Sequence, residues 1–211
     1  MSDYLKIIIR LDGSGVYYSP AEPIHIDALI AWALAPIHGS HNLTREDVPM
    51  EFPMPLAKRD INGSWVWVAS ALYPEGYFET TTYWRKRLRQ NRIEMTHGSP
   101  NLTSSTYRDW QMPLPLSLTR QMVGYAVGDR RDILRLLRRV PALGKKRAYG
   151  YGRIVDVAVE RIEQDYSLLR DGHTMRWLPH PKGGRLVRPR PPYWHPYGRV
   201  RCLEIGEVWS M

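Results

Sequence analysis

The stretch ALGKKRAYGYGRI, residues 142–154, indicates how this chain folds. It carries three consecutive cations and two tyrosines among three glycines, Gly144, Gly150 and Gly152. Because glycine has no Cβ, it adopts positive φ easily and lets the backbone approach a ligand closely. We therefore expect a basic, glycine-rich loop here, and the residues on either side predict what it connects.

The segment before the loop has the pattern of an amphipathic helix. Asp129 is placed to cap its N-terminus, and Pro141 ends it. Arginines mark one face of this segment, and apolar residues recur on the other at helical spacing: Ile133, Leu136, Leu137 and Val140. After the loop, residues 153–162 (RIVDVAVERI) alternate as a strand does. The expected order is helix, basic loop, strand.

The residue types of the loop favour nucleic acid as its ligand. Lys145, Lys146 and Arg147 would meet phosphates where exposed N–H groups already attract an anion. Tyr149 and Tyr151 offer rings on which a base or ribose can stack. The loop lacks the GxxxxGK[ST] spacing of a nucleotide-hydrolysing loop and does not open a helix, which excludes the Walker and Rossmann interpretations. The alternative is a flexible, soluble turn.

The chain opens with a strand followed by a helix. Residues 5–11 (LKIIIRL) form a β-branched apolar run that ends at a turn dipeptide, Asp12-Gly13. From Ile26 apolar residues recur at helical spacing, with Asp27 in the first turn and Pro36 as the expected stop.

Two further features occupy the middle of the chain. Asn62-Gly63 predicts a hairpin turn, followed by a strand over residues 64–72. Residues 78–118 are interpreted as an excursion from the core, a basic hairpin whose cations form a second candidate nucleic-acid contact: Arg85, Lys86, Arg87 and Arg89.

The last part of the chain, from about residue 167, is rich in proline and arginine with aromatic residues between them. Proline excludes long helices, so we expect an extended tail. Arginine next to aromatic rings suits draping over a nucleic acid or a partner subunit. The alternative is that the aromatic residues only cover the edge of the core.

Composition sets the broad class. A length of 211 residues allows one large domain or two small ones, and 43% hydrophobic content indicates a folded protein. The net charge of +9 favours a polyanionic partner. Cys202 is the single cysteine, which excludes an internal disulfide and a cysteine-based zinc site and fits a reducing compartment. No apolar run is long enough to span a membrane, so a cytoplasmic, soluble protein with no membrane contact is expected.

The opening strand with the helix IHIDALIAWAL (residues 24–34), and the late helix that runs into ALGKKRAYGYGRI, together resemble the RAMP superfamily of CRISPR-associated proteins. The tail, RWLPHPKGGRLVRPRPPYW (residues 176–194), is most similar to the group-five subunit of type IV complexes. The resemblance implies an α+β fold with a ferredoxin-like (RRM-like, RAMP) core. That core would comprise about residues 1–77 and 119–166 of a single domain, with the insertion at 78–118 and the tail at 167–211.

The resemblance also implies a function. Such a subunit is non-catalytic, holds the 5′ handle of the CRISPR RNA and caps one end of a filament of backbone subunits. Its partners would be the CRISPR RNA, backbone RAMP subunits, a large subunit and target DNA near the flanking motif, and it would need no metal or other cofactor. The residues that match the family's RNA-binding loop are Gly144, Lys145, Lys146, Arg147, Gly150, Gly152 and Arg153. The stretch from Arg85 to Arg92 matches a thumb-like excursion by position and charge.

Two other functions remain open. A RAMP nuclease cuts repeat RNA without metal, and His38 and His41 lie just after the first helix, where such enzymes often place a catalytic histidine. A histidine titrates near neutrality and suits either acid or base catalysis. A general RNA-binding protein would explain the charge and the loop but not the order of the elements.

Overall fold

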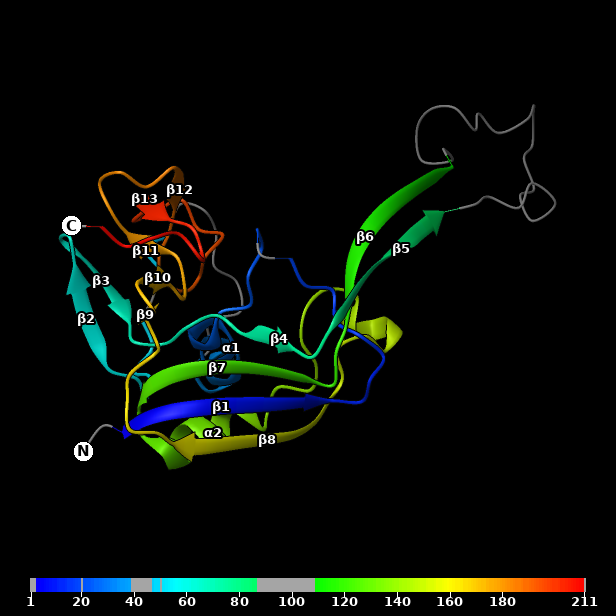
Figure 1. The fold of residues 1–211 in the computed structure, drawn as a ribbon, viewed down its shortest axis with the longest axis horizontal. Helices are drawn as coiled ribbons and strands as arrows, with labels where there is room; N and C mark the ends of the chain where they lie inside the picture. Colours follow the sequence, from blue (N-terminus) through cyan, green and yellow to red (C-terminus); the bar gives the residue numbers. More distant parts are fainter. Residues whose placement is uncertain (1–2, 20, 39–46, 50, 87–108, 211) are drawn as a thin grey trace.

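The computed structural model describes residues 3–19, 21–38, 47–49, 51–86 and 109–210. These residues form a sheet-rich structure of mixed α and β elements with two α-helices (Figure 1), compatible with the expected α+β class. Arg87, Arg89 and His41, which the sequence singled out, lie outside the described residues.

The central sheet has four strands in the order β4-β7-β1-β8. Their bounds are Asp3–Leu11 for β1, Tyr73–Glu75 for β4, Gln121–Gly128 for β7 and Ile154–Arg161 for β8. All three neighbouring pairs are antiparallel. Strands β1 and β8 lie side by side although they come from opposite ends of the core sequence (Figure 1).

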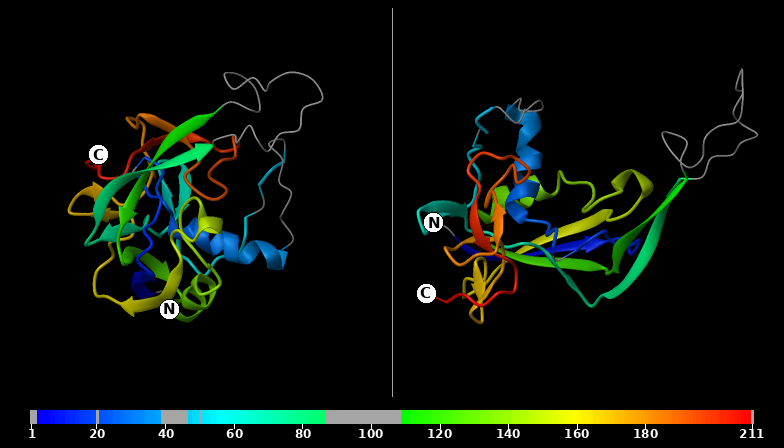
Figure 2. Two further views of the ribbon diagram at one scale, coloured as in Figure 1. Left: turned by 90° about the vertical axis from the view of Figure 1, so that its right-hand side faces the viewer. Right: turned by 90° about the horizontal axis from the view of Figure 1, so that it is seen from above.

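The helices α1 (Ile26–His38) and α2 (Arg130–Leu137) cover one face of this sheet, as the view from above in Figure 2 shows. The predicted cap at Asp129 is confirmed, because its carboxylate accepts the backbone N–H of Asp132 at 2.9 Å. The predicted stop at Pro36 is wrong by two residues, since α1 continues to His38. Proline removes a single backbone donor, a loss that a helix tolerates close to its end.

The core lies between the sheet and the two helices. Alternate residues of β1, Leu5, Ile7 and Ile9, are fully buried, as the period of a strand requires. They pack with Ile30 of α1 and Ile133 of α2 in the main hydrophobic cluster. The apolar periodicity of the sequence therefore identifies this interface.

A short hairpin joins β2 (Lys58–Ile61) to β3 (Ser64–Trp67). Asn62 and Gly63 both have positive φ, 50° and 76°, the conformation that two-residue hairpin turns favour. The predicted turn is confirmed, but the strand ends at Trp67 instead of continuing to residue 72. The N–H of Ala69 donates to the carbonyl of Trp67 at 2.9 Å, a tight turn that ends the strand.

The excursion is a long hairpin of β5 (Phe78–Lys86) and β6 (Trp110–Leu118). The strands pair continuously from Phe78 opposite Leu118 to Lys86 opposite Trp110. They extend away from the central sheet at the end opposite the N-terminus (Figure 1, upper right). The expectation of a hairpin is met over these residues.

The tail folds into short strands, and no helix occurs over residues 167–210. A two-stranded ribbon pairs β9 (Leu169–Arg170) with β10 (His173–Thr174). A three-stranded sheet follows in the order β11-β13-β12, formed by Leu178–Pro179, Val200–Leu203 and Arg185–Val187. Arg176 and Arg188 are almost completely buried, so the tail is not an extended arm whose arginines are all available to a partner.

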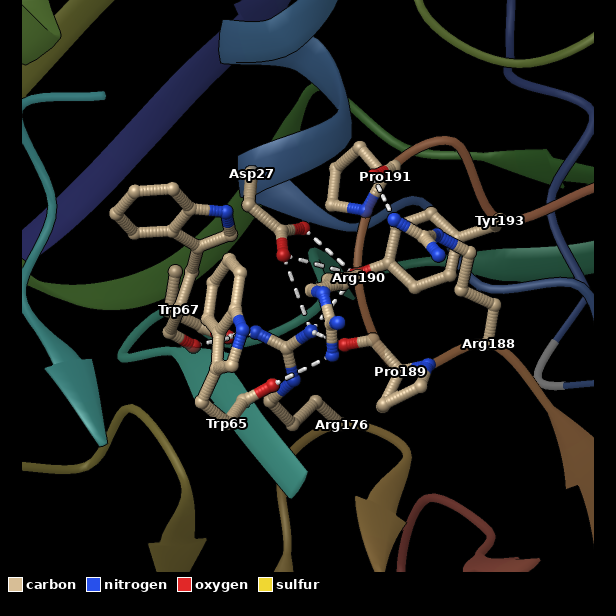
Figure 3. A network of polar contacts seen from close by, with 10 residues as sticks. Asp27, Trp65, Trp67, Arg176, Arg188, Pro189, Arg190, Pro191 and Tyr193 are labelled. Atoms are coloured by element: carbon tan, nitrogen blue, oxygen red, sulfur yellow. Dashed lines mark hydrogen bonds and ion pairs between the residues drawn. The ribbon is translucent and has the colours of Figure 1, made fainter. Parts of the chain in front are cut away.

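Arg176 anchors the tail to the start of α1 (Figure 3). Its guanidinium forms an ion pair with Asp27 at 3.0 Å, and both side chains are 0% exposed. It also donates to the carbonyls of Trp67 and Pro189, both at 2.6 Å, and to the Tyr193 hydroxyl at 2.7 Å. Burial raises the pKa of the Asp27 carboxyl, while the neighbouring guanidinium acts to lower it. Because a buried cation is costly unless it is paired and hydrogen-bonded, these contacts are what allow Arg176 to lie in the core.

Candidate nucleic-acid interface

The glycine-rich loop, residues 144–152, connects the end of the α2 segment to β8 and contains a single 3₁₀ turn, η3 (Arg147–Tyr149). Gly144, Gly150 and Gly152 have φ of 71°, 91° and 68°, as the sequence predicts for this loop. A Cβ at Gly144 would lie 2.6 Å from the Tyr17 carbonyl oxygen, and one at Gly152 would lie 2.2 Å from the Leu143 carbonyl oxygen. These two glycines are therefore required by close packing as well as by φ.

Hydrogen bonds hold the loop against the connection between β1 and α1. The N–H of Gly152 donates to the Gly15 carbonyl at 2.8 Å, and the Ser14 hydroxyl donates to the Gly150 carbonyl at 3.0 Å. The N–H of Leu143 donates to the Gly152 carbonyl at 2.8 Å, which closes the loop at its base. The backbone of the loop is thus fixed at several points, unlike that of a freely flexible turn.

The loop also contacts the long hairpin. The Lys146 ammonium lies 3.5 Å from the centroid of the Trp84 ring, and the Tyr149 ring meets the same indole edge-on at 4.6 Å. Tyr151 meets Tyr17 edge-on at 4.7 Å, and Tyr17 packs with apolar residues of β6. The glycine-rich loop and the described end of β5 therefore lie together through Trp84.

The cations of this region differ in their surroundings. Lys145 is exposed and forms an ion pair with Glu22. Arg147 and Arg153 are exposed, and the Arg147 guanidinium lies 6.0 Å from the ring of Trp32 on α1. At the end of β5, the Arg85 guanidinium lies 5.6 Å from the centroid of the Tyr83 ring, and Lys86 is the last residue of the strand.

The predicted stacking residues are also unequal. Tyr149 is 63% exposed, so a face of its ring is open to a ligand. Tyr151 is half-buried against Tyr17, whose pKa is raised by burial. Of the two tyrosines, Tyr149 is the better placed to stack on a base.

Sequence reasoning missed the role of Trp84, which joins the loop to the hairpin. The signal was present in the alternation of β5, because neighbouring residues of a strand point to opposite faces. Tyr83, 49% exposed, and the half-buried Trp84 follow that alternation. Nothing in the one-dimensional pattern indicated which of the two meets the loop.

Of the two histidines considered for catalysis, His41 lies outside the described residues. His38 is the last residue of α1. His25 is fully buried and stacks on Tyr193 with ring centroids 4.4 Å apart. Across the part of the chain that the structure describes, His, Cys, Asp and Glu form no group of three or more that could hold a metal ion. Neither α1 nor α2 is long and apolar enough to cross a bilayer, and the described residues hold no other candidate span.

Comparison with protein families gives a match to the model described as CRISPR type IV associated protein Csf3, over residues 3–101 and 84–204. The two matched ranges overlap over residues 84–101 and together include the central sheet, the glycine-rich loop and most of the tail. A comparison with curated proteins found no match.

Proposed function

Because the chain belongs to the Csf3 family of CRISPR type IV associated proteins, we propose that it is the non-catalytic subunit that holds the 5′ handle of the CRISPR RNA. Membership in this family ties the chain to a type IV CRISPR system. The observation that carries the finer proposal is the contact between Lys146 of the glycine-rich loop and Trp84 of the long hairpin. It unites two basic, aromatic segments into one surface suited to RNA.

The proposal includes a ferredoxin-like core of the RAMP type. In support, the chain passes through β1, α1, β4, β7, α2 and β8 in that order, apart from the β2–β3 and β5–β6 hairpins. This is the β-α-β-β-α-β order of such folds. The antiparallel sheet places the two strands of each β-α-β unit on either side of a strand from the other unit.

The chemistry of the surface fits single-stranded RNA. Exposed guanidinium groups at Arg147 and Arg153 would bind phosphates, and the open face of Tyr149 would accept a base or ribose. Lys145 would exchange its pairing with Glu22 for a phosphate. The hairpin would add Arg85, Lys86, Arg87 and Arg89 along the same backbone. Protein contacts of this kind read the shape of the RNA and leave target choice to base pairing.

As partners we propose backbone subunits, with this chain capping one end of their filament, together with a large subunit and target DNA near the flanking motif. Co-purification tests this proposal. A backbone subunit and an RNA of defined length should accompany the chain from cells that express the whole complex. A free-standing RNA-binding protein would instead carry RNA of mixed length and no subunit.

RNA binding is tested by charge reversal in the loop. We expect Lys145→Glu with Lys146→Glu to weaken handle binding and to reduce the dependence of affinity on salt, because fewer counterions are released when fewer phosphates are neutralised. The matched control is Arg131→Glu with Lys182→Glu, two exposed cations on α2 and in the tail that change the net charge equally. Equal affinity and equal salt slope in the loop variant and the native chain would refute the loop assignment.

The alternative of an RNA-processing nuclease makes a different prediction. Incubation of the native chain with repeat RNA in the presence of EDTA should leave the RNA intact if the subunit is non-catalytic. Cleavage that is lost in His38→Ala or His41→Ala would replace the proposed function with catalysis.

A further inference from the structure

A cavity of about 490 Å³ lies between α1, β3 and the tail. Four of the eight tryptophans of the chain line it, Trp32 from α1, Trp65 and Trp67 from β3, and Trp194 from the tail. Its volume is in the range of sites that enclose a small organic group. The folding of the tail onto the core, which Arg176 anchors, brings Trp194 to this position.

Cations already lie over the two tryptophans of β3, Trp65 and Trp67. The Lys58 ammonium lies 4.2 Å and the Arg190 guanidinium 4.3 Å from the Trp65 ring centroid. Trp67 is 3% exposed and lies 4.8 Å from the same ammonium. These rings build the wall of the cavity and have little surface left for a ligand.

The other two tryptophans remain open. Trp32 is 44% exposed and Trp194 is 53% exposed, although both line the cavity. They come from α1 and the tail, two elements far apart in the sequence, and both contribute indole surface to the same cavity. Exposed aromatic surface that lines a cavity is the arrangement that accepts a flat ring.

The cavity is connected to the RNA surface through one residue. The Arg147 guanidinium of the glycine-rich loop lies 6.0 Å from the centroid of the Trp32 ring, so the loop lies next to a residue that lines the cavity. Lys58 and Arg190 add positive charge next to the tryptophans. Glu51 also lines the cavity; its carboxylate pairs with Arg190 at 3.2 Å and with Lys58 at 3.9 Å and keeps further lone pairs that can accept from N–H groups. Flat apolar surface, neighbouring cations and one acceptor match a nucleobase attached to a phosphate backbone.

We propose that this cavity binds one unstacked nucleobase of the RNA whose phosphates the glycine-rich loop holds. The inference rests on the proposed function and adds to it a base-binding site on α1 and the tail. Proteins that bind single-stranded RNA commonly stack splayed bases on aromatic side chains in this way. The cavity would thereby position the strand as it leaves the loop.

The test compares Trp32→Ala and Trp194→Ala with the native full-length chain, using single-stranded repeat RNA and fluorescence anisotropy. We expect each variant to bind about tenfold more weakly, which is the effect of losing one base–aromatic stack. The salt slope should not change, since no phosphate contact is removed. Tyr4→Ala is the matched control, because Tyr4 is also 44% exposed but does not line the cavity. Trp194→Phe should restore most of the affinity.

RNAs that each carry one abasic nucleotide make the test specific to a base. One abasic position should weaken binding to the native chain and have no further effect on the Trp32→Ala, Trp194→Ala double variant. Circular dichroism checks that both variants keep the native fold. A variant that unfolds is replaced by the corresponding Trp→Leu change, which keeps an apolar side chain but removes the stacking face.

The outcomes separate the two proposals. If the loop variant weakens binding while the tryptophan variants and the abasic scan do not, the base site is wrong and the proposed function stands. If neither set weakens binding, the proposed function fails as well. If the tryptophan variants bind RNA normally but no longer co-purify with a protein subunit, the cavity docks a protein and the inference is overturned.

Discussion

The ammonium group of Lys146 lies 3.5 Å from the centroid of the Trp84 ring, which joins the glycine-rich loop to the long hairpin. Lys146 adopts a left-handed backbone conformation with φ of 58°, unusual for a residue with a side chain. A non-glycine residue keeps such a conformation only where its surroundings hold it. The contact therefore links a constrained loop residue to the element that extends farthest from the sheet.

The first prediction concerns this contact. A double-mutant cycle of Trp84→Ala and Lys146→Ala, measured by urea unfolding, should show a coupling energy of about 0.5–2 kcal/mol, the range of cation–π pairs. Lys145→Ala combined with Trp84→Ala is the control and should be additive, because Lys145 pairs with Glu22 instead. Additive effects in the first cycle would mean that the contact does not stabilise the loop.

The buried ion pair between Arg176 and Asp27 makes the second prediction. Arg176→Met should lower the free energy of unfolding by about 3–5 kcal/mol, because it leaves the Asp27 carboxylate buried without its cation. Arg161→Met removes an exposed pair with Asp3 and should cost less than about 1 kcal/mol. Similar losses in the two variants would show that the tail does not depend on Arg176.

A pH-dependent stability is the third prediction. Burial, with the added repulsion of Arg176, lowers the pKa of His25 well below its ordinary value of 6.5, and neither ring nitrogen has a hydrogen-bond partner. Between the folded and unfolded pKa values the unfolded chain binds more protons. The free energy of unfolding should therefore rise with pH up to about 6.5 and level off above it.

The variant His25→Phe isolates this effect, since it keeps an aromatic ring against Tyr193 and cannot titrate. The difference between the native chain and the variant should change by at most about 1.4 kcal/mol per pH unit below 6.5, the value for one proton. Chemical unfolding across this pH range measures it. A difference that does not depend on pH would indicate that His25 titrates normally in the folded state.

The fourth prediction compares two glycines of the loop. Gly150 and Gly152 both have positive φ, but a Cβ at Gly150 meets nothing within 4 Å, whereas one at Gly152 meets the Leu143 carbonyl oxygen at 2.2 Å. Gly150→Ala should cost only the backbone strain of about 1–2 kcal/mol. Gly152→Ala should cost clearly more and also weaken RNA binding, because the base of the loop must shift. Thermal unfolding and RNA affinity measured in parallel check this order, and equal losses in the two variants would contradict it.

Local patterns in the sequence predicted much of the core. Three features were predicted correctly: the run from Leu5 to Leu11, the cap at Asp129 and the turn at Asn62-Gly63. Each depends on residues close together in the sequence or on the side-chain periodicity of a single element. The positive φ of Gly144, Gly150 and Gly152 agrees with the prediction for this loop, since glycine adopts that conformation without a steric cost. The boundaries at Pro36 and Trp67 were misjudged by two and five residues, because a helix tolerates a proline close to its end and a tight turn at Ala69 ends the strand early.

The tail was the larger error. Its prolines correctly excluded helices, but we expected an extended tail with arginines suited to draping over a partner, whereas Arg176 and Arg188 are buried. Composition indicates how many cations a segment carries and not which carbonyls and carboxylates it meets. Arg176 is buried only because Asp27, Trp67 and Pro189, from three other places in the chain, provide its partners.

The candidate site divides in the same way. Local residue types and their spacing were sufficient to predict that residues 144–152 form a glycine-rich basic loop between a helix and a strand. No local pattern indicates that Trp84 meets Lys146, that Lys145 pairs with Glu22, or that Trp32 and Trp194 line one cavity; these contacts appear only in the folded chain. Each of these contacts joins segments far apart in the chain, and their meeting depends on how the sheet, the hairpin and the tail pack against one another.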